Sequence, residues 1–388
     1  MKKLLLLYSL LFVLPQLHAQ ENIPYKNVAR ERADNIVKVL DIQEVQKKEQ
    51  IRNIIANQYM ALNELHSNRE LDIKKNEQQR IQITKSTDKK VSGLHDKFVK
   101  NLDKLLNQKQ VEEVKNGMTY HTVPLTYANY LLMLPDLSEE DRKVIYAFLT
   151  EAREHAMDAG TSKGKHAWFN KYKGKIANHL SAKGYRLKEA GEDWATRRNP
   201  SSPALEVFES NRIMSALKNL DTTKHVSVRN LIAYQYQQIS KIQRTKTQRI
   251  EAVSAMQISK EEKEAQNQIA WEESMIQLTK QKSSFLNQMS VFLDKDQIET
   301  VKNEMTGQGL KKEYNRFVAL LPSLKDEHKA KVYDYLVEAR ENAMNVLTSR
   351  ERNQWFAKYR GRANNYLSKQ GYDLRAATEA LEKKQLSP

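Results

Sequence analysis

Apolar residues recur at three- and four-residue intervals along most of the chain, which is the spacing of one face of an α-helix. In the first part of the chain this pattern predicts helices over residues 25–40 and 43–68. A very polar stretch follows at residues 70–97, which we expect to form a solvated helical arm or partly a loop. The helical stripe resumes beyond it, so the chain is predicted to be helical almost throughout.

Three places are expected to depart from that pattern. Gly160 and Gly184 each follow an apolar-periodic run and are predicted to end a helix in the left-handed conformation. The segment Tyr120-His121-Thr122-Val123 has β-like character and is short. Glycine (11) and proline (8) are otherwise scarce, which favours long helices over architectures that need many turns.

An internal repeat organises the chain. Residues 151–187 read EAREHAMDAGTSKGKHAWFNKYKGKIANHLSAKGYRL, and residues 338–374 read EARENAMNVLTSRERNQWFAKYRGRANNYLSKQGYDL, at an offset of 187 residues. Upstream, IRNIIANQY at 51–59 matches VRNLIAYQY at 228–236 at an offset of 177 residues. The second copy therefore carries ten additional residues between these blocks.

The repeat predicts an all-α protein of two tandem helical-bundle domains with long helical hairpins. The first domain is assigned to residues 21–190 and the second, diverged one to residues 205–388. Residues 191–204 are assigned as a linker, because they contain the proline- and serine-rich stretch Asn199-Pro200-Ser201-Ser202-Pro203.

The N-terminus has the pattern of a cleavable signal peptide over residues 1–19. Lys2 and Lys3 precede an apolar run from Leu4 to Leu14, and cleavage is expected after Ala19. The alternative, a membrane anchor, would need a longer apolar run. We therefore expect a periplasmic or secreted protein with no stable membrane insertion after signal removal. Without cysteine, the chain has no disulfide, thiolate metal site or cysteine nucleophile.

Two blocks carry a family resemblance. NGMTYHTVPLTYANYLLMLPDLS (116–138) and EAREHAMDAGTSKGKHAWFNKYKGKIANHLSAKGY (151–185) resemble the bacterial family called domain of unknown function 3826. The resemblance covers most of residues 24–190, and a weaker second copy covers 205–376. It implies an exported protein of polysaccharide-degrading Gram-negative bacteria, and it implies no particular activity.

Charge indicates an anionic partner. The formal net charge is +16, and no Asp or Glu occurs from Ala159 to Lys188, where lysines alternate with aromatic residues. An acidic glycan or another anionic envelope component would suit such a surface, whereas nucleic acid is not expected outside the cytoplasm. The alternative is a solvated, lysine-rich helix face. The chain has no P-loop and no GxGxxG motif, so no cofactor is expected.

Aromatic and cationic residues of the first copy are candidates for ligand binding, because aromatic faces stack on sugar rings and cations attract carboxylates. These candidates are Tyr127, Trp168, Lys171, Tyr172 and Lys175. The alternative is core packing, since Trp168, Tyr172 and Ile176 recur at four-residue spacing.

Several titratable residues of the first copy are replaced in the second. The replacements are Tyr120 by Gly307, His121 by Gln308, His155 by Asn342, Asp158 by Asn345, His166 by Asn353 and His179 by Tyr366. Tyr120, His121, Arg153 and His166 are the catalytic candidates, because they could move protons or neutralise charge. The alternative is drift at surface positions. A metal site built from His121, Asp158 and His166 lacks metal-motif spacing, so none is expected.

Three functions remain open from the sequence. The first is binding of an acidic polysaccharide, or an accessory role on one, through the basic-aromatic surface of the first domain. The second is a polysaccharide lyase-like enzyme, with Arg153 or Lys171 neutralising a uronate and Tyr120 or His121 removing the α-proton. The third is a periplasmic helical chaperone, because LNQKQVEEVKNGM and LDKDQIETVKNEM resemble helices of small periplasmic chaperones.

Overall fold

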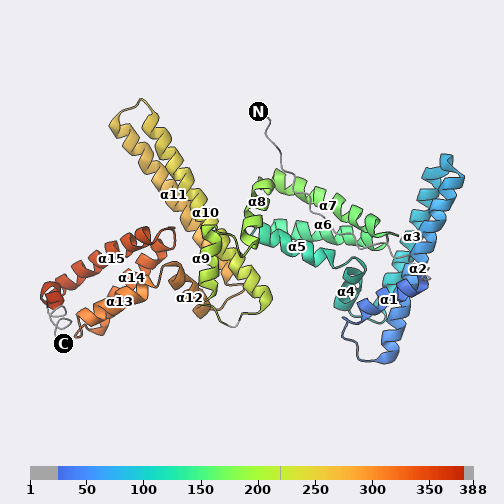
Figure 1. The fold of residues 1–388 in the computed structure, drawn as a ribbon, viewed down its shortest axis with the longest axis horizontal. Coiled ribbons are helices and arrows are strands. Elements are labelled where there is room, and N and C mark those ends of the chain that lie inside the picture. The colour runs from blue at the N-terminus through green and yellow to red at the C-terminus, as the bar shows by residue number, and fades with distance from the viewer. Residues whose placement is uncertain (1–24, 219, 380–388) are drawn as a thin grey trace, which may run out of the picture. The chain divides into compact units, whose positions relative to one another are not determined.

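The computed structural model describes residues 25–218 and 220–379, and within them every regular element is helical (Figure 1). The all-α prediction is therefore confirmed for this part of the chain. The predicted signal peptide lies outside the described residues. In chain order the elements are α1 (Tyr25–Val37), α2 (Val45–Lys75), η1 (Glu77–Gln79), α3 (Arg80–Asp103), α4 (Gln108–Met118), α5 (Thr122–Met133), α6 (Glu139–Met157), α7 (Ser162–Ala182), α8 (Leu187–Arg198), α9 (Leu205–Met214), α10 (Thr222–Ala255), α11 (Lys260–Met289), α12 (Lys295–Met305), α13 (Gly309–Leu320), α14 (Asp326–Ala343) and α15 (Ser349–Lys369).

By its internal contacts the chain divides into two compact units. The first comprises the described residues up to Ala128 together with Glu139–Lys183, and the second comprises Asn129–Ser138 and the described residues from Gly184 onward. Among the described residues, no helix combines the length and apolar character needed to cross a bilayer.

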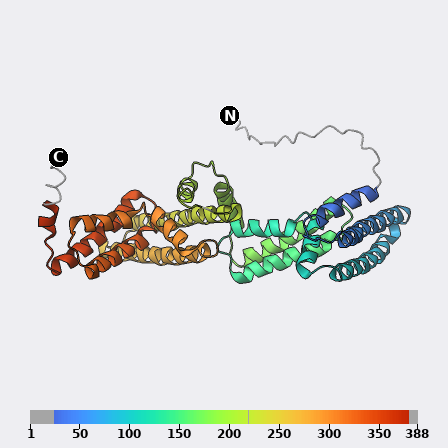
Figure 2. The ribbon, with the colours of Figure 1, turned by 90° about the horizontal axis from the view of Figure 1, so that it is seen from below.

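The core of the first unit joins α1, α2, α3 and α4. Buried side chains from these helices include Ile36, Ile55, Leu102, Val114 and Met118. Both ribbon views show α6 and α7 running side by side in the same unit (Figures 1 and 2). The α2–α3 hairpin leaves this core as an arm whose outer part is largely exposed, because its sequence there is polar.

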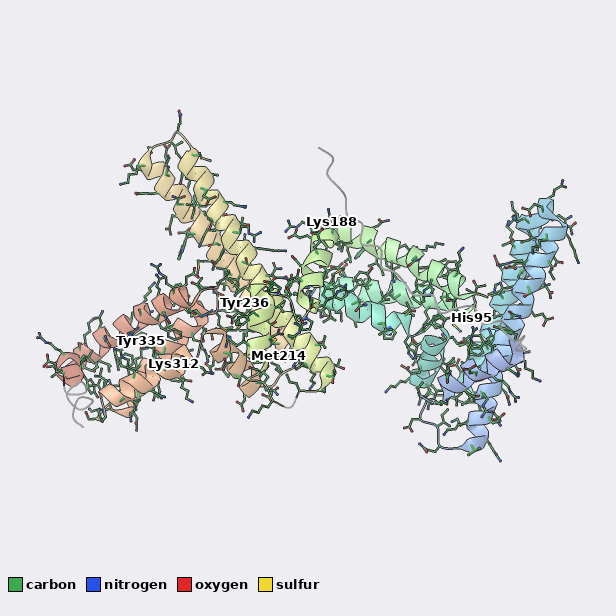
Figure 3. The ribbon with its side chains drawn as sticks, viewed as in Figure 1. His95, Lys188, Met214, Tyr236, Lys312 and Tyr335 are labelled. Atoms are coloured by element: carbon green, nitrogen blue, oxygen red, sulfur yellow. The ribbon has the colours of Figure 1, made fainter. Side chains whose placement is uncertain are left out.

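The second unit repeats this order of helices. Tyr236 on α10 and Met214 on α9, both labelled in Figure 3, belong to one core cluster with Val228, Met289 and Met305. A second cluster joins α13, α14 and α15. The hairpin helices account for nine of the ten additional residues, because α10 and α11 have 34 and 30 residues whereas α2 and α3 have 31 and 24.

Two local predictions are wrong and one is confirmed. The β-like segment is a turn: Tyr120 and His121 have φ values of 58° and 51°, and Thr122 then begins α5. The run is too short to pair as a strand, and the Thr122 hydroxyl instead donates to the Thr119 carbonyl at 2.6 Å. Gly160 does not have positive φ, whereas Gly184 does, at 89°.

Candidate functional site

A cavity of about 650 Å³ lies between the α2–α3 arm and the α6–α7 hairpin of the first unit. Its wall is rich in titratable side chains. These are His66, Arg69, Glu70, Asp88, His95, Glu154, His155 and Asp158, with Trp168 beside them. We call it the histidine cavity.

Asp158 lies at the centre of the histidine cavity. Its carbonyl oxygen is 2.7 Å from His66 Nε2, and its Oδ2 is 2.8 Å from His95 Nδ1. Figure 3 places His95 on the arm helix α3, so the arm and the end of α6 meet at this carboxylate. Asp158 Oδ1 and His66 Nδ1 are buried without a hydrogen-bond partner among the described residues. Buried polar atoms of this kind are ready to bond a ligand.

The hydrogen bond that His95 donates to the Asp158 carboxylate raises the pKa of His95 above its ordinary value, although desolvation by burial opposes the shift. Glu154 acts in the same direction, with its Oε2 3.6 Å from His95 Nε2. His95 therefore keeps its proton to a higher pH than a free histidine does.

Glu154 is itself held by two cations. Burial tends to raise its pKa, but hydrogen bonds from Lys115 and Arg153 outweigh burial and keep the pKa below its ordinary value. Arg153 is only 1% exposed and also bonds Asn116 Oδ1 at 2.9 Å and Glu112 Oε2 at 2.8 Å. Arg153 thus orients Glu154 from behind the cavity wall.

The second unit contains the same supporting network. Arg340 bonds Glu299 at 2.6 Å and Asn303 at 2.9 Å, and Lys302 bonds Glu341 at 2.7 Å. These residues occupy the positions of Arg153, its partners and Lys115. Because both copies retain it, the network is a requirement of the fold.

The titratable part of the cavity is not retained. His66, His95, His155, Asp158 and Gly160 match Gln243, Lys282, Asn342, Asn345 and Leu347. The local geometry survives nonetheless, since Gln243 Nε2 donates to the Asn345 carbonyl at 3.2 Å, as His66 pairs with that of Asp158.

The matching cavity of the second unit is smaller, at about 270 Å³. Met275 lines it at the position of Asp88, and Leu278 lines it at the position of Val91. The second copy thus keeps the backbone arrangement and loses the groups that exchange protons near neutral pH.

The four catalytic candidates from the sequence do not line one cavity. The rings of Tyr120 and His166 lie 6.1 Å apart, and Tyr120 and His121 border a different hollow, which also contains Lys165. Arg153 is buried in the network described above.

The ligand-binding candidates separate into rim, core and remote positions. Trp168 is half-buried at the histidine cavity, stacked on His155 with ring centroids 4.4 Å apart, and Lys171 Nζ lies 4.8 Å from its ring. Tyr172 is a core residue, as its alternative interpretation predicted, and its hydroxyl donates to Glu151 at 2.7 Å.

Two ligand-binding candidates remain to be placed. Lys175 Nζ lies 4.0 Å above the centre of the Tyr172 ring. Tyr127 on α5 packs edge-on against Tyr146, with 5.2 Å between ring centroids, and it is not among the residues that line the histidine cavity.

The sequence analysis missed His66 and His95. Both lie in the polar arm, outside the long matching blocks, so they did not enter the comparison of the two copies. The available signal was the offset itself, which pairs His66 with Gln243 at 177 residues and His95 with Lys282 at 187. In the described part of the chain, no group of three or more acidic or histidine side chains has a geometry that could hold a metal ion.

A family model described as protein of unknown function (DUF3826) matches residues 26–199 and, a second time, residues 206–386. The chain belongs to the DUF3826 family. The two matches confirm two tandem DUF3826 copies, and the histidine cavity lies in the first of them. A comparison with curated proteins finds no match to the chain.

Proposed function

We propose that the first DUF3826 copy binds an acidic polysaccharide, with a sugar ring against Trp168 and its hydroxyl groups directed into the histidine cavity. The observation that carries this proposal is the position of Trp168, half-buried beside a cavity that contains unpartnered polar atoms. Sites for small ligands commonly combine an aromatic wall with a few convergent polar groups.

The polar groups suit sugar hydroxyls. Asp158 Oδ1 can accept a hydrogen bond, and His66 Nδ1 can donate or accept one according to its tautomer. The Trp168–His155 stack supplies an aromatic surface beside them. Glu154 is paired with Lys115 and Arg153, and Asp158 is hydrogen-bonded to His95, so these contacts reduce the repulsion that the two carboxylates exert on an anionic ligand.

The preference for an acidic chain comes from α7. This helix, Ser162–Ala182, contains no Asp or Glu, and Lys163, Lys171 and Lys175 are exposed on it. Such a surface attracts carboxylates at long range. The proposed polymer would therefore lie along α7 and reach the histidine cavity at Trp168. Export through the N-terminal signal would place the protein where such polymers occur.

A lyase-like enzyme is the second candidate function, and the His95–Asp158 pair favours it. A carboxylate that orients an imidazole is a common arrangement for proton transfer. In this geometry His95 or His66 takes the role that the sequence assigned to Tyr120 or His121, and Lys171 is the exposed candidate for neutralising a uronate.

One experiment separates binding from cleavage. The mature protein is titrated calorimetrically with polygalacturonate, alginate and, as neutral controls, galactan and xylan. The same mixtures are followed by ultraviolet absorbance for unsaturated products. Binding of the polyuronates without new absorbance supports the binding function, and new absorbance supports the lyase. Equal binding of neutral and acidic polymers, or no binding to any of them, would overturn the proposal.

A further inference from the structure

A second concave region of the first unit consists of two hollows, of about 100 and 220 Å³, that share Arg32, Tyr59, Tyr120 and Lys165. We call it the tyrosine cavity. The smaller hollow includes residues 159–161, which also line the histidine cavity, so the two cavities adjoin at this loop.

Within the described part of the chain, Lys165 is a buried cation without a carboxylate in ion-pair contact, although the charge of Asp158 acts on it. It is 5% exposed, and its ammonium donates to the carbonyls of Met118 at 2.9 Å and Met157 at 3.5 Å. Lys165 Nζ lies 5.7 Å from the centre of the Tyr59 ring, and the guanidinium carbon of Arg32 lies 5.6 Å from it. Among the described residues, no carboxylate forms an ion pair with either cation.

The charges of Lys165 and Arg32 beside the Tyr59 ring repel each other, and the burial of Lys165 further disfavours its charged form. Desolvation, followed by the charge of Arg32, lowers the pKa of Lys165 to about 8. An anion bound between them would offset both effects.

Tyr120 borders both hollows in a backbone conformation that glycine would adopt more easily. Tyr120 and His121 have φ values of 58° and 51°, and the matching Gly307 and Gln308 have 63° and 60°. The turn is thus the same in both copies, but only the second uses glycine at its first position. A tyrosine in the left-handed region is strained, because its Cβ lies too close to the following carbonyl oxygen. The first copy therefore has a tyrosine side chain at residue 120 despite backbone strain, and such strain is common at functional sites.

The second copy shows what fits beside the matching tyrosine. Tyr236 matches Tyr59, Arg352 matches Lys165, and Glu209 stands at the position of Arg32. The charges of Glu209 and Arg352 both act on Tyr236. The second copy thus has a carboxylate in this region, which is ion-paired with Arg212, whereas the first copy has a cation in its place.

We propose that the tyrosine cavity of the first copy binds a carboxylate, held by Lys165 and Arg32 with the Tyr120 side chain against it. The ligand class is a small carboxylate, and a uronic acid residue fits because the histidine cavity adjoins. Only this last assignment rests on the proposed function. Carboxylate binding does not depend on it.

The test is calorimetric titration of the full mature chain with sodium D-glucuronate and, separately, with D-glucose. Glucuronate is expected to bind, and glucose is not. Arg32→Gln is expected to weaken glucuronate binding at least tenfold. Arg30→Gln, which removes an exposed arginine from α1, the helix that also carries Arg32, is the matched control and is expected to leave binding unchanged.

Tyr120→Gly is a second variant, and it is not expected to disturb folding. It copies Gly307 and relieves the backbone, so the variant should melt at the same or a higher temperature while glucuronate binding is lost. Absence of glucuronate binding, equal binding of glucose, or equal weakening by Arg32→Gln and Arg30→Gln would overturn the proposal. Binding of glucuronate without binding of any polyuronate would support this site and contradict the proposed function. Binding of polyuronates without binding of glucuronate would contradict this site and support the proposed function.

Discussion

Gly160 lies directly beneath the imidazole of His66: a Cβ at residue 160 would be 2.7 Å from His66 Cδ2 and 2.8 Å from Cγ. The second copy pairs Leu347 with Gln243 at the same positions. The glycine of the first copy is thus explained by the space that the histidine ring needs. It is not explained by a left-handed helix end, which was the sequence-based expectation.

Gly160→Ala should push His66 away from the Asp158 carbonyl and destabilise the protein by about 1 kcal/mol, the lower end of the cost of overpacking. Gly174→Ala is the matched control, because nothing lies within 4 Å of a Cβ there and α7 continues through it. It should stabilise the protein by roughly 0.5–1 kcal/mol. Urea unfolding of the full chain, followed by circular dichroism, measures both. Shifts of the same sign would show that the contact with His66 does not matter.

Arg153→Met should destabilise the first unit by about 3–5 kcal/mol, because it leaves Glu112, Glu154 and Asn116 without their shared partner. Arg340→Met should cost the second unit a similar amount. Arg350→Met is the control at an exposed position and should change stability by no more than about 0.5 kcal/mol. The measurement is again urea unfolding. If Arg153→Met matches the control, Arg153 is free to act on a substrate, as the sequence analysis proposed.

Asp158→Asn, which copies Asn345, should lower the pKa of His95, because the hydrogen bond that His95 donates to Asp158 is the largest cause that raises it. The raised pKa stabilises the folded state fully below the unfolded histidine pKa, and this stabilisation is lost as pH rises through the folded value. NMR titration of the His95 ring measures the shift. Asp88→Asn, which also changes the cavity wall but does not bond His95, is the control. An unchanged His95 titration in Asp158→Asn would contradict the pairing.

The lowered pKa of Lys165 gives a pH signature of opposite sign. The folded pKa of about 8 lies below the ordinary lysine pKa of 10.5, so the unfolded chain binds more protons between these values and stability rises with pH. Relative to Lys165→Met, the wild type should gain about 2 kcal/mol between about pH 7 and pH 9.5. Lys163→Met, the exposed control, should show no such gain. A flat difference for Lys165→Met would mean that Lys165 titrates as a surface lysine.

Periodicity was sufficient to predict the helices because the stripe that it marks is the buried one: Tyr172 and Ile176 recur at four-residue spacing and both are in the core. The same spacing left open whether Trp168 packs in the core or binds a ligand, and the structure puts it at the rim of the histidine cavity. Local patterns failed where the cause is a distant contact. His66, 94 positions earlier in the chain, leaves no room for a side chain at Gly160. His95 becomes a site residue only because the arm brings it to Asp158.

The turn at Tyr120 and His121 was mistaken for a strand for a related reason. Aromatic and β-branched residues favour extended backbone. Here the Thr122 hydroxyl donates to the Thr119 carbonyl and the His121 amide donates to the Asn116 carbonyl of α4, and these bonds close a turn. The preference of these residues for extended backbone was outweighed by hydrogen bonds that the sequence pattern does not reveal.

The most direct test of the proposed function compares Trp168→Ala with Trp355→Ala in calorimetric titrations with polygalacturonate. Both tryptophans are half-buried and carry a lysine over the ring, at 4.8 Å for Lys171 and 5.1 Å for Lys358, but only Trp168 borders the histidine cavity. We expect Trp168→Ala to weaken binding at least tenfold and Trp355→Ala to leave it unchanged, with circular dichroism confirming that both variants are folded. Equal weakening by the two substitutions, or none by Trp168→Ala, would contradict the assignment of glycan binding to the first copy.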